Sequence, residues 1–206
     1  MQVRLATVIA CTALGFTMAT GAAPTTAVVG QEAPAFSAVD VRGKTVSLAD
    51  FKGKHVVLEW VNPGCPFVVK HYGASNMQAT QKNAVDKGVV WLAVNSTAKD
   101  AGDYRTPQAM AAWMQSQKAH ASTTLMDEDG KVGRAYGART TPHMYIVNPQ
   151  GQLIYAGGID SIPSANAADI AKATNYIKTG LNEALAGKPL TASNTRPYGC
   201  SIKYKS

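Results

Sequence analysis

The sequence predicts a three-layer α/β/α domain with a central mixed sheet and an N-terminal β-hairpin. Segments with strand character alternate with helical segments along the chain, and a second β-hairpin closes the series. The continuous apolar run over residues 89–95 is typical of a strand that is covered on both faces. The chain length suits one such domain with a core of its own.

Each element has a local signal. Thr106 and Pro107 read as the N-cap and first position of a helix, and Gly137 closes a short one. Asn148–Gly151 reads as a hairpin turn. The predicted elements are, in order, a hairpin with strands at 34–36 and 40–48, a strand over 55–60, a helix over 65–82, a strand over 89–95, a helix over 106–118, a strand over 123–126, a helix over 130–136, a hairpin over 143–156 and a helix over 165–185.

The first residues predict export. Arg4 supplies a short positive segment, and residues 5–19 form an apolar run that is too short to span a bilayer. We therefore expect a signal peptide over residues 1–23, with cleavage at about 21–27, and a periplasmic or secreted protein without a stable membrane span.

Charge gives little support for a nucleic-acid partner. The chain has 20 basic and 13 acidic residues, and removal of the leader takes away Arg4 alone. The basic residues are scattered singly along the chain, which favours a solvated surface over a nucleic-acid site. The leader also contains Cys11, so the mature chain has two cysteines, Cys65 and Cys200, which an oxidising compartment allows to pair.

Cys65 is the most informative residue. It follows an apolar strand and a Pro-Gly turn, and Pro66 suits the first position of a helix. A thiol at a helix N-terminus meets free backbone N–H groups and the positive end of the helix dipole, and both favour the thiolate. The expected chemistry is therefore thiol–disulfide or thiol–peroxide exchange.

The chain resembles the thioredoxin superfamily, in the branch shared by peroxiredoxin-like (alkyl hydroperoxide reductase/thiol-specific antioxidant) and redoxin proteins. The resemblance covers residues 29–160 and implies a thioredoxin-like fold over 29–187, followed by a tail over 188–206 that carries Cys200. It rests on four features: the lead-in 30–36 with 43–54, Cys65 after the central strand, Thr141-Pro142 before a strand, and the turn 148–151.

The sequence departs from both branches. Thioredoxins carry Cys-x-x-Cys, but here Val68 follows Cys65 at that spacing and Asn62 precedes it. Peroxiredoxins carry Pro-x-x-x-Thr/Ser-x-x-Cys and a distant arginine. Leu58 and Asn62 fill the first two positions here, and Arg139 is the nearest arginine to the expected third.

Two further residues are candidates for catalysis. Cys200 is the one thiol left to resolve an intermediate on Cys65, and a structural Cys65–Cys200 link is the alternative. Glu59 lies in an apolar strand, six residues before Cys65, at the spacing of the buried acid in thioredoxin. It is expected to accept a proton from the thiol with a pKa raised by burial, or else to point to solvent at a strand end.

The resemblance also implies a substrate site. Pro142 would be a cis-proline that packs on the sulfur and, with Thr141, presents backbone to the substrate. Trp60 and Phe67 are expected to form an apolar collar around the thiol, and Pro66 is grouped with them.

The preferred function is an exported thiol oxidoreductase acting on protein or small-molecule thiols and disulfides, with an external reductant and neither cofactor nor metal. One alternative is a thiol peroxidase that reduces peroxides. Another is a copper-binding module in which Cys65 acts with His71 or His143.

Overall fold

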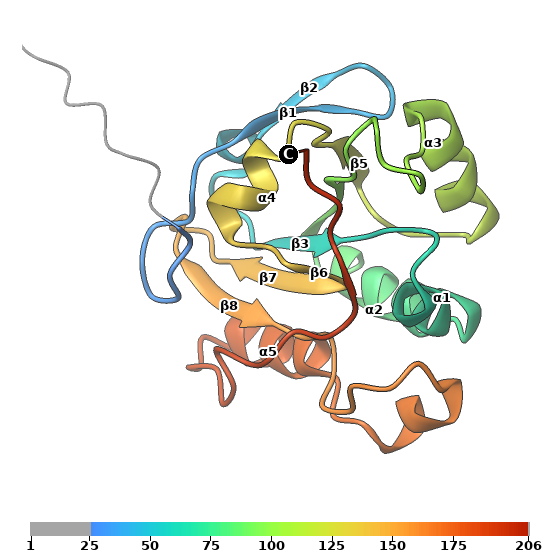
Figure 1. The fold of residues 1–206 in the computed structure, drawn as a ribbon. Helices are drawn as coiled ribbons and strands as arrows, with labels where there is room; N and C mark the ends of the chain where they lie inside the picture. The colour runs from blue at the N-terminus through green and yellow to red at the C-terminus, as the bar shows by residue number, and fades with distance from the viewer. Residues whose placement is uncertain (1–25, 206) are drawn as a thin grey trace, which may run out of the picture.

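The protein is described by a computed structural model that covers residues 26–205. The predicted signal peptide lies outside the described residues. A central sheet is enclosed by helices on both faces (Figure 1). One face is covered by four helices: α1 (Pro66–Gly73), α2 (Asn76–Val85), α3 (Pro107–Ser116) and α5 (Tyr176–Leu185). The other is covered by α4 (Lys131–Tyr136) and the N-terminal segment. The predicted three-layer fold is confirmed.

The sheet has seven strands in the order β2-β1-β5-β4-β3-β7-β8. The strands are β1 (Ser37–Asp40), β2 (Thr45–Ser47), β3 (Val56–Trp60), β4 (Val90–Asn95), β5 (Thr123–Met126), β7 (His143–Val147) and β8 (Leu153–Gly157). Strand β3 pairs parallel with β4 and antiparallel with β7, so the sheet is mixed as predicted. All five positions of β3 are buried because helices cover both faces.

The predicted first hairpin has its turn at Gly43, but the first strand is β1 rather than residues 34–36. The backbone before β1 is engaged elsewhere, since Ala33 N–H donates to Gly151 O and Tyr136 Oη donates to Pro34 O. A 3-10 turn, η1 (Leu48–Phe51), then leads from β2 toward β3.

The helix predicted over 65–82 is two helices, α1 and α2. Ser75 between them adopts a left-handed conformation with φ 58°, which ends regular helical hydrogen bonding. The Tyr72 carbonyl at the break accepts from Ser75 N–H at 3.1 Å and also from the side-chain amide of Gln78 at 2.9 Å.

The helix predicted over 165–185 is also interrupted. It consists of a 3-10 segment, η2 (Ala167–Lys172), and α5. Asn175 between them accepts a hydrogen bond from Lys178 N–H as the N-cap of α5, and Ser161 N–H donates to Thr174 O. These hydrogen bonds hold the backbone of residues 173–175 in an extended conformation. The helix predicted from the apolar spacing was therefore too long.

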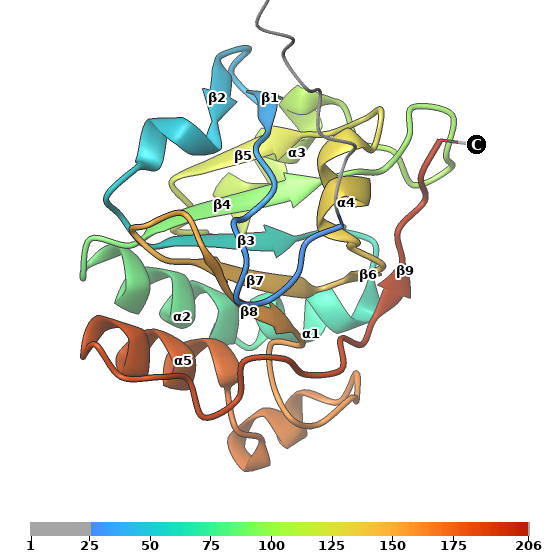
Figure 2. The ribbon, with the colours of Figure 1, turned by 90° about the vertical axis from the view of Figure 1, so that its left-hand side faces the viewer.

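After α5 the chain returns across the domain and ends beside α4 (Figures 1 and 2). On the way β9 (Cys200–Ser201) pairs antiparallel with β6 (Thr140–Thr141). Tyr204 Oη donates to Ala138 O at 2.8 Å, and Ala98 N–H donates to Lys203 O at 2.8 Å. The tail is thus packed on the domain along its length.

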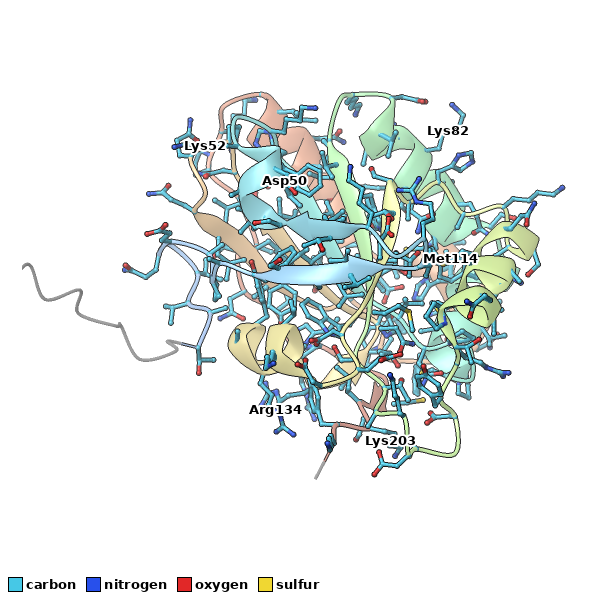
Figure 3. All side chains as sticks on the ribbon, turned by 90° about the horizontal axis from the view of Figure 1, so that it is seen from above. Asp50, Lys52, Lys82, Met114, Arg134 and Lys203 are labelled. Carbon is cyan, nitrogen blue, oxygen red and sulfur yellow. The ribbon has the colours of Figure 1, made fainter. Side chains whose placement is uncertain are left out.

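The charged side chains Lys52, Lys82, Arg134 and Lys203 project outward from different parts of the molecule (Figure 3). This distribution agrees with a solvated basic surface. Within residues 26–205, no helix has the length and apolar character that crossing a membrane requires.

Candidate active site

Cys65 lies at the N-cap of α1, with φ −82° and ψ 122°, and Pro66 occupies the first turn as predicted. The preceding turn is closed by Asn62, whose carbonyl accepts from Cys65 N–H at 3.1 Å and whose side chain accepts from Gly64 N–H at 2.8 Å. The turn aims Cys65 toward the loop before β7. Its side chain is buried, with 2% exposure.

The peptide bond between Thr141 and Pro142 is cis, and it lies against Cys65. The Cys65 thiol donates to Thr141 O at 3.0 Å. The tail also passes close to this backbone. A Cβ added to Gly199 would come within 2.0 Å of Thr141 O, so this approach requires glycine.

Pairing of β6 with β9 places Cys200 directly opposite Thr141. The two thiols are free, and they lie close enough for each to shift the pKa of the other. The structure therefore brings together two cysteines that are far apart in the sequence.

The pKa values of the two thiols move in opposite directions. Burial raises the pKa of Cys65, but the neighbouring Cys200 thiol, the Thr141 side chain and the backbone N–H of Val68 outweigh it and lower that pKa. Burial, the hydrogen bond to Cys65 and its negative charge raise the pKa of Cys200 to about 12. Cys65 is thus the more acidic of the two thiols, and Cys200 is the one that holds its proton to higher pH.

Glu59 is fully buried on the same face of β3 as Val57, facing α1 and α2. It does not point to solvent. Its carboxyl accepts hydrogen bonds from Tyr72 Oη at 2.8 Å, Gln81 Nε2 at 2.9 Å and Trp91 Nε1 at 2.7 Å. Burial raises the pKa of Glu59 despite these three donors. None of its hydrogen bonds reaches Cys65, so the proton-acceptor role remains a prediction.

The predicted apolar collar is present only in part. Phe67 is half-buried in the cluster that contains Cys65, and Pro66 is exposed next to it. Trp60, however, belongs to the core cluster on the opposite face of the sheet, where it stacks on Tyr136 and donates to Ser96. Side chains alternate along β3, so Trp60 faces away from the sulfur.

The peroxiredoxin-like positions are occupied differently. The Asn62 side chain donates to Asp103 at 2.7 Å, and Arg139 is exposed, with no hydrogen bond to Cys65. Both ring nitrogens of His71 have hydrogen-bond partners, and His143 Nδ1 contacts Tyr145 Oη. No group of three or more metal-ligating side chains is found among residues 26–205.

Sequence reasoning missed a buried polar cluster beside the site. Lys70, His71, Asp160 and Tyr198 are all at least nine-tenths buried and lie within reach of one another. Their pairing depends on contacts between α1, the loop after β8 and the tail. The only sequence signal was a tyrosine two residues before Cys200.

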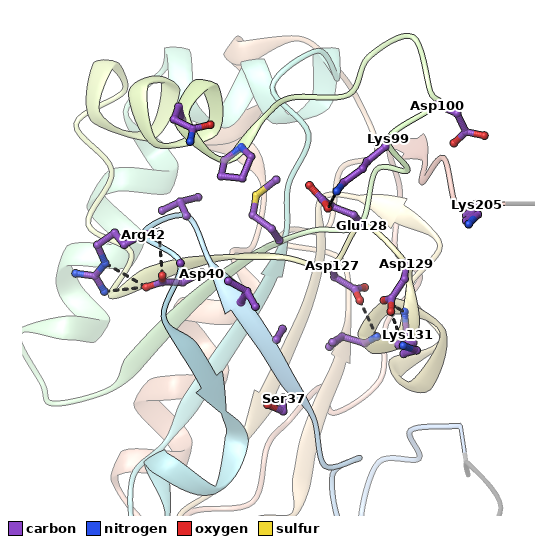
Figure 4. A pocket seen from close by; sticks show the side chains of 18 residues that line it. Ser37, Asp40, Arg42, Lys99, Asp100, Asp127, Glu128, Asp129, Lys131 and Lys205 are labelled. Atoms are coloured by element: carbon purple, nitrogen blue, oxygen red, sulfur yellow. Dashed lines mark hydrogen bonds and ion pairs between the residues drawn. The ribbon is translucent and has the colours of Figure 1, made fainter.

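A surface pocket lies toward the β1 side of the sheet, between β1, β5 and the start of α4 (Figure 4). Six of its charged groups form ion pairs: Lys99 with Glu128, Lys131 with Asp129, and Arg42 with Asp40. Asp127 accepts from the N–H groups of Val132 and Gly133 at the start of α4. The segment 127–130 is therefore a turn that leads into α4, with Asp127 accepting from its first N–H groups.

Comparisons with known proteins identify the family and the fold. A family model described as the AhpC/TSA family matches residues 29–156. The thiol-disulfide oxidoreductase ResA of Bacillus thuringiensis subsp. konkukian (strain 97-27) is 26% identical over 155 residues, which span 71% of this chain and 80% of the relative.

Two solved structures share the fold. An uncharacterized conserved protein from Geobacillus kaustophilus has a TM-score of 0.73 and 28% identity, and the match covers 86% of this chain and 93% of that one. A thiol:disulfide interchange protein from Bacteroides sp. has a TM-score of 0.52 and 25% identity, covering 63% of this chain and 81% of that one. These likenesses support the thioredoxin-like fold.

Proposed function

The chain belongs to the AhpC/TSA family of redoxins, and on that premise we propose that it is a thiol–disulfide oxidoreductase in which Cys65 is the nucleophile and Cys200 the resolving cysteine. The observation that carries the proposal is the β6–β9 pairing, which holds Cys200 against Cys65. The relatives named as thiol-disulfide oxidoreductases support the same reaction.

Opposite pKa directions assign the roles. Cys65 is the better thiolate, so it attacks the substrate disulfide and forms a mixed disulfide with it. Cys200 then attacks the Cys65 sulfur, the substrate leaves as a thiol, and an intramolecular Cys65–Cys200 disulfide remains. An external reductant returns both thiols to the reduced state.

Thiol mapping tests this proposal. The mature protein is isolated under acid quench, its free thiols are alkylated after denaturation, and Cys65 and Cys200 are located by mass. We expect a Cys65–Cys200 bridge that thioredoxin reduces readily. A bridge that resists reduction would identify a structural link instead, and two thiols that stay free under disulfide oxidants would contradict the proposal.

A thiol peroxidase is the second candidate because the family match includes thiol-specific antioxidants by name. In that reaction the peroxide would oxidise Cys65 to a sulfenic acid. The Cys200 thiol would then condense with the sulfenic acid, and the same Cys65–Cys200 disulfide would form. Loss of the Cys65 thiol within seconds at micromolar peroxide would favour it. Oxidation no faster than that of a free thiol would exclude it.

We also propose that the protein is exported, with the leader at residues 1–23 removed and the domain beginning near residue 29. An oxidising compartment suits a pair of cysteines that must cycle between thiols and disulfide. The mass of the protein from an envelope or culture fraction tests this, because a retained Met1 would contradict cleavage at about 21–27.

A further inference from the structure

A buried cluster of polar side chains lies beside the two cysteines and takes no part in the chemistry proposed above. Lys70 Nζ lies 3.6 Å from Asp160 Oδ2, and His71 Nε2 lies 3.7 Å from the same oxygen. Neither Lys70 Nζ nor Asp160 Oδ2 has a hydrogen-bond partner. Charges that are removed from water in this way are costly unless they are paired, so the cluster needs an explanation.

Tyr198 of the tail completes the cluster. Its hydroxyl donates to Asp160 Oδ1 at 2.5 Å and lies 3.2 Å from His71 Nε2. Lys70 Nζ lies 5.6 Å from the centre of the Tyr198 ring, a cation–π contact. The ring also packs edge-on against Phe67, with 5.7 Å between centroids. The tyrosine therefore bridges the tail to α1 and to the loop after β8.

The hydrogen bonds in the cluster run in one direction. The Asn76 amide donates to His71 Nδ1 at 2.8 Å, so the proton of a neutral His71 is on Nε2 and points at Tyr198 Oη. Burial lowers the pKa of His71 to about 4; the Asp160 charge opposes this shift and the Lys70 charge adds to it, so the neutral form prevails at pH 7. The chain of donors ends on the Asp160 carboxylate, which is the strongest acceptor available.

We infer that this cluster anchors the tail and thereby positions Cys200 for attack on the disulfide at Cys65. Tyr198 is two residues from Cys200, and only Gly199, which passes tightly over Thr141 O, lies between them. Lys70, His71, Asp160 and Tyr198 are positioning residues, since none of them touches a sulfur. The effect of the anchor on the reaction rests on the proposed function. The docking of the tail by the cluster does not.

The anchor affects two steps in opposite ways. When the tail is docked, Cys65 is 2% exposed, so an external disulfide reaches the sulfur only after the tail moves. Once a mixed disulfide exists on Cys65, a docked tail raises the effective concentration of Cys200. Its thiolate attacks the Cys65 sulfur, the bond to the substrate breaks, and the substrate thiolate takes up the proton that Cys200 released.

Tyr198→Phe tests the inference, because it removes the hydrogen bonds and retains the ring. Equilibration with glutathione buffers measures the effective concentration of the Cys65–Cys200 pair. We expect that concentration to fall roughly ten- to a hundredfold, as is typical of losing a hydrogen bond to a charged group. A tenfold fall raises the reduction potential by about 30 mV.

Tyr136→Phe is the matched control. Tyr136 is also a buried tyrosine, and its hydroxyl donates to Pro34 O at 2.9 Å, away from the cysteines. The Tyr136→Phe variant shows the effect of losing a buried tyrosine hydroxyl alone. We expect the reduction potential of the Cys65–Cys200 pair to stay unchanged in it. Equal shifts in both variants would overturn the inference, whereas a wild-type protein that forms no bridge would instead contradict the proposed function.

A second readout needs no redox activity. In a Cys200→Ser background, the rate at which iodoacetamide alkylates Cys65 reports how often the tail leaves the site. We expect Tyr198→Phe to raise this rate several-fold and Tyr136→Phe to leave it unchanged. An unchanged rate in Tyr198→Phe would overturn the anchoring role even if the potential moved.

The double variant Lys70→Met/Asp160→Asn covers the case in which Tyr198→Phe does not fold. It removes both buried charges together and keeps the side-chain volumes, a change that proteins often tolerate. The Tyr198 hydroxyl then donates to a neutral acceptor, so we expect both readouts to shift in the same directions by a smaller factor. Wild-type values for both would contradict the inference.

Discussion

At the scale of single residues, the site depends on two identical thiols in different surroundings. Cys65 sits at a helix N-terminus with several donors to its sulfur, while Cys200 enters from the tail and faces the Cys65 charge. A proton between the two sulfurs can stay on only one of them. In the proposed reaction it stays on Cys200, and Cys65 is the nucleophile.

Cys200→Ala is expected to raise the pKa of Cys65, because it removes the side-chain donor to the sulfur. Cys65 is a thiolate above its pKa and becomes protonated as the pH falls through that pKa. The alkylation rate falls with the thiolate. The rate profile of the variant should therefore move to higher pH. Ultraviolet absorbance of the thiolate during a pH titration measures the shift, and a profile that stays in place would contradict the assigned hydrogen bond.

Glu59→Gln is expected to lower the free energy of unfolding by about 1–2 kcal/mol. The oxygen of the new amide can still accept from Gln81 and Trp91. The NH₂ group of the same amide then faces Tyr72 Oη, so the Tyr72 O–H loses its acceptor. Urea denaturation measures the loss.

A proton-acceptor role for Glu59 predicts a second effect. The rate of disulfide exchange would fall, and its pH profile would lose one titrating group. Stability loss with an unchanged pH profile would instead assign the carboxyl to the hydrogen-bond network of the core alone. Trp91→Phe serves as the control, because it removes one of the three donors and leaves the carboxyl in place.

At the scale of elements, the two-residue pairing of β6 with β9 builds the site. Each strand is too short to form alone, so the pairing depends on packing of the segments on either side. The sequence predicted the tail and its cysteine but not this pairing, because two residues carry no recognisable period. The interrupted helices were missed for a related reason: hydrogen bonds to distant segments override local helical spacing.

Gly199→Ala tests this element directly. The added Cβ would overlap Thr141 O, so we expect β9 to detach and the yield of the Cys65–Cys200 bridge to fall by at least tenfold. The core should stay folded, since the clash is confined to the tail. Gly102→Ala is the control because its Cβ meets nothing within 4 Å. A normal bridge yield in Gly199→Ala would show that β9 does not hold Cys200.

At the scale of the whole molecule, the tail returns across the domain after the last helix and closes the site (Figure 2). A Cys65–Cys200 bridge would therefore enclose most of the domain in a covalent loop. Loops of this size restrict the unfolded chain, so we expect the oxidised protein to unfold at higher denaturant than the reduced one, by about 2–5 kcal/mol.

Urea titrations of the oxidised and reduced protein measure this difference. By linkage, this difference in unfolding free energy should equal a second difference. That is the free energy of forming the bridge with glutathione in the folded chain, compared with the unfolded chain. Cys200→Ser under oxidising conditions is the control and should resemble the reduced protein. Equal stability in both redox states would mean that the folded protein does not hold the two thiols closer than the unfolded chain does.

The sequence by itself determined the layers of the fold and the place of Cys65 at the start of a helix, because each depends on residues close together in the chain. The proline beside Cys65 followed from the resemblance to the family, since the two residues are far apart in the chain. The sequence did not reveal that Trp60 faces away from the site, that Glu59 is held by three donors, or that Tyr198 joins a buried cluster. Those outcomes depend on which segments meet across the sheet and along the tail. Only the tertiary structure decides such contacts, because their energies arise between residues far apart in the chain.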